Sequence, residues 1–158
     1  MRDVAMTYPD GRVALKDINF TAQLGEIVAL VGPTGAGKTS LAYLIPSFLQ
    51  ASSGTVCIDG IDIKDISVPS LRKQIAYVFQ ETQLFSDSIA ENIRYGNNAA
   101  SIAEVREAAR TAGADDFIMA LPEGYDTNLG TVTSKLSVGQ KQRISIARGL
   151  LKESKLSL

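Results

Sequence analysis

Hydrophobic and polar positions along the chain predict a strand, loop and helix unit near the N-terminus. Residues 13–32, VALKDINFTAQLGEIVALVG, begin with alternating positions and end in the near-continuous apolar run IVALV. Alternation is typical of a half-exposed antiparallel strand, whereas a continuous run is typical of a strand covered on both faces. A glycine-rich stretch, residues 32–37, follows, and KTSLAYLIPSFLQ then has the pattern of a helix whose last turns Pro46 bends or closes.

The rest of the chain predicts a hairpin followed mainly by helices. In GTVCIDGIDI, two β-prone runs flank Asp59-Gly60, which is a strong hairpin turn signal. In chain order, the remaining expectations are a helix that starts near Ser67 and Pro69, a strand over 75–80, mainly helices over 88–121, a helix over Ser137–Lys152 and the first residues of a strand over 155–158.

Composition narrows the class of protein. The 158 residues suit one domain, and 16 basic against 17 acidic side chains give a net charge of −1, which does not favour nucleic-acid binding. The apolar runs are far shorter than the about 18 residues needed to span a bilayer. Cys57, the single cysteine, lies between apolar neighbours and suits a buried strand. Because the chain contains no histidine, a general base must be a carboxylate or a group from outside the chain.

The stretch GPTGAGKT, residues 32–39, has the form of a phosphate-binding loop. It matches G-x-x-x-x-G-K-[ST] and lies between a predicted buried strand and a helix, as that motif requires. Gly35 and Gly37 let backbone N–H groups turn toward phosphate oxygens, Lys38 neutralises the β- and γ-phosphates, and Thr39 offers a hydroxyl to Mg²⁺. Asp59 is a candidate carboxylate for the metal, although an Asp-Gly turn already explains it.

A second polar helix start occurs in SKLSVGQKQR, residues 134–143. Ser137 and Gln140 have the spacing of a capping box, so the serine is expected to cap the last helix. A helix start with a hydroxyl and a nearby glycine, here Gly139, can also bind an anion. The residues alone leave both interpretations open.

Four stretches together resemble the ATP-binding domain of ABC transporters: GPTGAGKTS, YVFQE, LFSDSIAENIRYG and LSVGQKQRISIARGLL. The resemblance covers essentially the whole chain, and the LFSDSIAENI pattern is most similar to exporters. It implies an α/β fold with a P-loop NTPase (RecA-like) core, an antiparallel β subdomain and an α-helical subdomain. The implied parts are residues 1–80 with the P-loop, a helical subdomain over 81–136, and the signature helix with the start of a core strand over 137–158.

The resemblance also implies roles for individual residues. Tyr8 matches the aromatic residue that stacks on adenine, and Gln80 matches the glutamine that approaches Mg²⁺ and the attacking water. Lys38 and Gln80 are thus the expected catalytic residues, and Thr39 and Gln80 the expected metal contacts. The expected cofactor-binding residues are Tyr8, Gly32, Pro33, Thr34, Gly35, Ala36, Gly37, Lys38, Thr39, Ser40, Ser137, Gly139 and Gln140.

The implied cofactors are ATP and Mg²⁺, and the implied partners are a transmembrane domain and a second ATP-binding domain. In the family, LSVGQ faces the γ-phosphate bound by the opposite subunit, so two chains sandwich two ATP molecules head to tail. The expected location is the cytoplasmic face of the inner or plasma membrane.

The sequence departs from the family pattern in three places. The usual second glycine of the signature is Val138, and NLGTVTSK, residues 128–135, lacks the acidic and basic residues often found there in exporters. In the family, the signature helix is followed by a strand that ends in Asp-Glu and, further along the chain, by a histidine. We expect this Asp-Glu pair and this histidine to be missing here. Two alternatives therefore remain: a nucleotide-binding fragment without turnover, and a DNA-associated ABC ATPase, although the coiled coils or zinc modules of that class are not seen.

Overall fold

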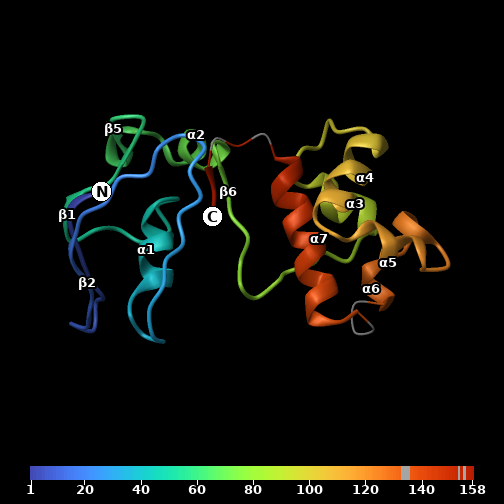
Figure 1. The fold of residues 1–158 in the computed structure, drawn as a ribbon, viewed down its shortest axis with the longest axis horizontal. Coiled ribbons are helices and arrows are strands. Elements are labelled where there is room, and N and C mark those ends of the chain that lie inside the picture. The colour runs from blue at the N-terminus through green and yellow to red at the C-terminus, as the bar shows by residue number, and fades with distance from the viewer. Residues whose placement is uncertain (133–135, 153, 155) are drawn as a thin grey trace. The chain divides into compact units, whose positions relative to one another are not determined.

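A computed structural model describes residues 1–132, 136–152, 154 and 156–158. Residues 133–135, which belong to NLGTVTSK, and Lys155, the first residue of the expected last strand, lie outside the described residues. The chain divides into two compact units, Met1–Lys73 and Gln74–Leu158 (Figure 1).

The unit Met1–Lys73 is built on a three-stranded antiparallel sheet with the strand order β2-β1-β3. Val4 pairs with Ile18 and Met6 with Leu15, and these alternate side chains bury one face of the sheet. Its core combines the strands with α1, through Val4, Met6, Leu15, Leu41, Leu44 and Val56. The elements are β1 (Arg2–Thr7), β2 (Val13–Ile18), α1 (Lys38–Leu44), β3 (Ser53–Thr55), β4 (Cys57–Ile58), β5 (Ile61–Asp62), η1 (Ile63–Asp65) and α2 (Val68–Lys73).

The expected hairpin at Asp59-Gly60 is confirmed. Strands β4 and β5 pair antiparallel, and both turn residues have positive φ, 50° and 81°, as a type I′ turn requires. Asp59 is therefore explained by the turn, and Cys57 lies half-buried in β4 as a free thiol.

The expected strand over IVALV is wrong. Residues 27–31, all of which the structure describes, lie outside any strand, and Ile27 and Val31 are 100% and 88% exposed. A buried parallel strand needs neighbouring strands to satisfy its backbone, and in the described residues the parallel pairing is confined to β6 and β7 of the other unit. Helix α1 ends at Leu44, so of the two expected effects of Pro46, bending or closing the last turns, the structure shows closure; the proline has no backbone N–H to continue the helix.

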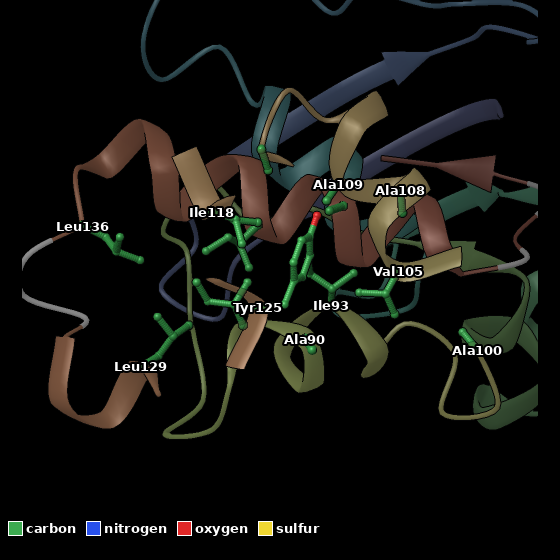
Figure 2. Close-up of a cluster of buried hydrophobic side chains, with 14 residues drawn as sticks. Ala90, Ile93, Ala100, Val105, Ala108, Ala109, Ile118, Tyr125, Leu129 and Leu136 are labelled. Carbon is green, nitrogen blue, oxygen red and sulfur yellow. The ribbon is translucent and has the colours of Figure 1, made fainter. Parts of the chain in front are cut away.

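The unit Gln74–Leu158 is mainly helical. The last helix packs against α3 and α4, and Figure 2 shows side chains of this core gathered around the ring of Tyr125. The expected strand over 75–80 is shortened to two residues, which pair in parallel with the expected C-terminal strand. The elements are β6 (Ile75–Ala76), α3 (Ile89–Arg94), α4 (Ile102–Thr111), α5 (Asp115–Met119), η2 (Gly124–Asp126), α6 (Leu129–Val132), α7 (Val138–Leu151) and β7 (Leu156–Ser157).

A buried polar network ties α3 to α7 inside this unit. Asn92 is fully buried, and its side-chain oxygen accepts hydrogen bonds from the Phe85 N–H and from Arg148, at 2.8 and 3.0 Å. Arg148 Nε also donates to the Asn92 carbonyl at 2.7 Å, and its Nη1 to the Gln83 carbonyl at 3.1 Å. Burial lowers the pKa of Arg148, yet each bond needs the guanidinium as a donor. The segment after Gln80 is thus held to α7.

Candidate nucleotide-binding site

The backbone of the glycine-rich loop adopts positive φ angles at two of its glycines. Gly35 and Gly37 have φ of 85° and 86°, in the left-handed region that favours glycine. A Cβ on Gly37 would lie 2.4 Å from the Ala14 carbonyl oxygen and 2.8 Å from Leu15 Cδ2. A side chain at this position would therefore push α1 away from β2, whereas around Gly35 there is open space.

Lys38 closes the loop on itself. Its ammonium donates hydrogen bonds to the carbonyl oxygens of Gly32 and Pro33, both at 2.8 Å. The Ala36 N–H bonds back to the Pro33 carbonyl at 3.2 Å. The positive charge of Lys38 is thus held by neutral oxygens of the loop itself, where an incoming phosphate group can replace them.

Most loop side chains face solvent, and this leaves the loop accessible. The exposed positions are Gly32, Pro33, Thr34, Gly35, Ala36 and Thr39. The hydroxyl of Thr39 is an oxygen ligand of the kind Mg²⁺ takes, and phosphate oxygens and water commonly fill the remaining positions. Among the described residues, His, Cys, Asp and Glu form no group of three that could hold a metal ion on its own.

Tyr8 lies in the same unit as the loop and contacts it through Ser40. The Tyr8 hydroxyl and Ser40 Oγ are 2.8 Å apart, within hydrogen-bond distance. The guanidinium carbon of Arg12 lies 4.4 Å from the centre of the Tyr8 ring, a cation–π distance. Sequence reasoning missed Arg12, although Pro9-Asp10-Gly11 is a turn signal that brings residue 12 back over residue 8.

The start of α7, the second segment predicted to bind phosphate, has the capping box that the sequence predicts. Ser137 Oγ accepts the Gln140 N–H at 3.2 Å, and Gln140 Oε1 accepts the Ser137 N–H at 2.8 Å, which confirms the capping box. Val138 is 79% exposed, and a Cβ on the exposed Gly139 would meet the Arg143 side chain at an ordinary 3.8 Å. Contacts in the described part of the chain therefore give no steric reason for a glycine at position 139.

The site residues fall into two groups, one in each unit. Tyr8 and residues 32–40 come together in Met1–Lys73, while Ser137, Gly139 and Gln140 come together in Gln74–Leu158. Gln80 also belongs to the second unit and is exposed in a bend after β6. Among the described residues, no helix has both the length and the apolar character needed to cross a membrane.

Comparisons with known proteins place this geometry in a family. Residues 15–158 match the family described as ABC transporter. The chain is 51% identical over 154 residues to the ATP-dependent lipid A-core flippase of Syntrophus aciditrophicus (strain SB), covering 98% of this chain and 26% of the flippase. It is 50% identical over 150 residues to the ATP-binding cassette sub-family B member 6 of Homo sapiens, covering 95% of this chain and 18% of that protein.

A solved structure supports the same assignment. The structure of a bacterial Atm1-family ABC exporter with ATP bound superimposes with a TM-score of 0.93 at 43% identity, covering 99% of this chain and 28% of that one. The chain thus spans about a quarter or less of the length of these relatives. It belongs to the ABC transporter family and has the mixed α/β fold of that family's ATP-binding domain.

Proposed function

We propose that the chain binds Mg-ATP as the ATP-binding domain of an exporter and couples ATP binding and hydrolysis to the export of a substrate across a membrane. The observation that carries this proposal is the loop geometry: Gly37 seats α1 against β2, and the Lys38 ammonium lies on the loop that would receive phosphates. The names of the relatives support it, because they describe an ATP-dependent flippase and an exporter with ATP bound.

Each residue of the first unit has a distinct role in this proposal. Backbone N–H groups of residues 32–39 and the Lys38 ammonium hold the phosphates, and the Thr39 hydroxyl contributes one oxygen to Mg²⁺. The ring of Tyr8 stacks on adenine. The metal, when bound, supplies positive charge at the β- and γ-phosphate oxygens.

Hydrolysis is an in-line displacement at the γ-phosphorus. A water oxygen forms a bond to phosphorus while the bond to the β,γ-bridging oxygen breaks, and ADP leaves with that electron pair. Lys38 stabilises the negative charge that develops on the transferring oxygens, and Gln80 orients the water. The water's proton passes to a carboxylate or to a group outside this chain, since the sequence has no histidine.

The functional unit in this proposal is a pair of ATP-binding domains. Ser137, Gly139 and Gln140 of one chain approach the γ-phosphate held by the partner's loop, so the two chains pair head to tail. The exposure of Val138 and the space around Gly139 support this role, because a phosphate group can reach the start of α7 from outside the chain.

The proposed second partner is the transmembrane domain of an exporter, which would place this domain at the cytoplasmic face of the inner or plasma membrane. We propose no nucleic-acid partner, because the net charge of −1 gives no electrostatic attraction to phosphate backbones.

Calorimetric titration of ATP into the parent chain and into Lys38→Ala tests the proposal. Hydrogen bonds to charged groups are worth about 1.5–3 kcal/mol, so ATP should bind about 10- to 150-fold more weakly to the variant. Lys16→Ala, which removes an exposed lysine of β2, is the matched control and should bind like the parent. Unchanged ATP affinity in Lys38→Ala would refute the phosphate-loop assignment, and phosphate release measured on the same samples tests hydrolysis separately.

A further inference from the structure

The end of α7 contacts the part of the chain that comes just before Gln80. Lys152, the residue that caps this helix, donates from Nζ to the Ile75 carbonyl at 2.7 Å. Gly149 lies against Val78, because a Cβ added to the glycine would be 3.1 Å from Val78 Cγ2. Gln80 itself is exposed. The residues that lead to Gln80 are therefore held against the last turns of α7.

Arg148, in the same turns of α7, contacts the part of the chain that comes just after Gln80. Its Nη1 donates to the Gln83 carbonyl at 3.1 Å, and its guanidinium carbon lies 5.1 Å from the centre of the Phe85 ring. Its Nε and Nη2 donate to the backbone and side-chain oxygens of Asn92, at 2.7 and 3.0 Å. One guanidinium thus joins two segments to α7, which the planar fork of arginine permits and a lysine ammonium does not reproduce.

The elements on either side of this contact have support of their own. The Phe85 N–H donates to Asn92 Oδ1 at 2.8 Å, and the Phe85 carbonyl accepts from Asn92 Nδ2 at 3.0 Å. Helix α7 is anchored in its core by Ile144, which is fully buried. Loss of the Arg148 donors should therefore release Gln83 from α7, while Phe85 stays bonded to α3 and α7 keeps its place in the core.

We infer that Arg148 is a positioning residue for Gln80. It fixes the far end of residues 79–82 by holding Gln83 to α7, and the contacts before Gln80 fix the near end. A short segment fixed at both ends has fewer conformations to lose when its side chain engages a ligand. Arg148 contacts neither nucleotide nor metal in this assignment. The inference rests on the proposed function, in which Gln80 approaches Mg²⁺ and orients the attacking water.

A double-mutant cycle on the effect of magnesium tests the inference. ATP is titrated into the parent, Arg148→Met, Gln80→Ala and the double variant, once with MgCl₂ and once with EDTA. Methionine keeps the apolar stem of the arginine and removes its donors. Groups that orient a metal contact change metal affinity by about 10- to 100-fold, so each single variant should lower the ratio of the two ATP affinities about 10-fold or more. The double variant should lower it no further, and with EDTA all four proteins should bind ATP equally.

Two further variants separate positioning from a general loss of stability. Arg148→Lys keeps the charge but not the fork, so it should restore only part of the magnesium ratio. Ile144→Val removes one methyl group from the buried face of the same helix and should keep the full ratio. Should Arg148→Met fail to fold, Arg148→Lys decides the matter with the same two titrations.

Three results would overturn the inference: a full magnesium ratio in Arg148→Met, an equal loss in Ile144→Val, or losses that add in the double variant. Failure of the proposed function gives a different result, because the parent would then not bind ATP or Gln80→Ala would keep the full ratio. A nitroxide label at Glu81→Cys, in a Cys57→Ser background, reports on the segment without ATP. Arg148→Met should make this label more mobile, and an unchanged spectrum would by itself overturn the inference.

Discussion

The two segments that we propose to bind phosphate are held in place in different ways. The start of α7 continues into a helix of 14 residues whose inner face, at Ile144 and Ala147, is fully buried in the larger apolar core. The glycine-rich loop instead follows residues 27–31, which are exposed and outside any strand, and precedes a helix of seven residues. Packing along a long helix holds the first segment. A short helix anchored by Leu41 and Leu44, together with the close approach of Gly37 to Ala14, holds the second.

The largest expected effect concerns the packing of α7. Ile144→Ala removes a side chain that is 0% exposed, and such a cavity costs about 2–5 kcal/mol of unfolding free energy. Hydrogen exchange should show lost protection of the α7 amides and unchanged protection in β1 and β2. Val138→Ala on the exposed face of the same helix should stay within about 0.5 kcal/mol of the parent. Equal losses of protection in both units would show that the units do not hold their sites separately.

The converse prediction concerns the loop. Gly37→Ala places a Cβ 2.4 Å from the Ala14 carbonyl oxygen and adds the strain of a positive φ, at a combined cost of about 2–4 kcal/mol. β1 and β2 should lose hydrogen-exchange protection while α7 keeps it. Gly35→Ala is the matched control, because its φ is nearly the same but the space around it is open. Gly35→Ala should lower the free energy of unfolding by about 1 kcal/mol. Similar losses of stability in the two variants would show that the close approach of α1 to β2 does not contribute to stability.

The same contrast explains which features the sequence could predict. The start of α7 follows from Ser137 and Gln140, which satisfy each other locally, and the hairpin follows from Asp59-Gly60 alone. The run IVALV has the composition of a buried strand, but composition does not supply the neighbouring strands that such a segment must pair with. Whether residues 27–31 form a strand therefore depends on pairing with distant segments, which the local pattern does not reveal.

The phosphate loop was predictable as a motif, but its internal contacts were not. The sequence identifies Lys38, Thr39 and the glycines as a unit, because their spacing is specific to phosphate binding. It does not reveal that Ser40 turns toward Tyr8, or that Arg148 joins Asn92 across 56 positions of the chain. Both depend on the orientation of a single side chain in a packed interior.

A smaller effect separates the capping role of Ser137 from its proposed role between chains. Ser137→Ala removes one half of the capping box and should lower stability by about 1 kcal/mol. Ser101→Ala is the matched control, because Ser101 forms the same reciprocal pair with Glu104 at the start of α4. Both variants should lose similar stability in urea unfolding, but only Ser137→Ala should weaken ATP-dependent pairing of chains in sedimentation. Equal pairing in the two variants would contradict the head-to-tail assignment.

The smallest effect is a pH dependence confined to the helical unit. The Tyr125 hydroxyl donates to Asp115 Oδ1 at 2.6 Å, and burial first, then this bond, raises the pKa of Tyr125. In the unfolded chain, a tyrosine hydroxyl ionises at about pH 10. Because folding raises the pKa of Tyr125, its neutral hydroxyl stabilises the folded unit fully below that pH. This stability should fall as the pH rises from about 10 toward the folded pKa. Tyr125→Phe should weaken that part of the alkaline loss, measured by urea unfolding at a series of pH values, while β1 and β2 keep their exchange protection. An unchanged alkaline loss in Tyr125→Phe would place the titrating group elsewhere in the chain, and the Tyr125–Asp115 hydrogen bond would then contribute no pH dependence to the helical unit.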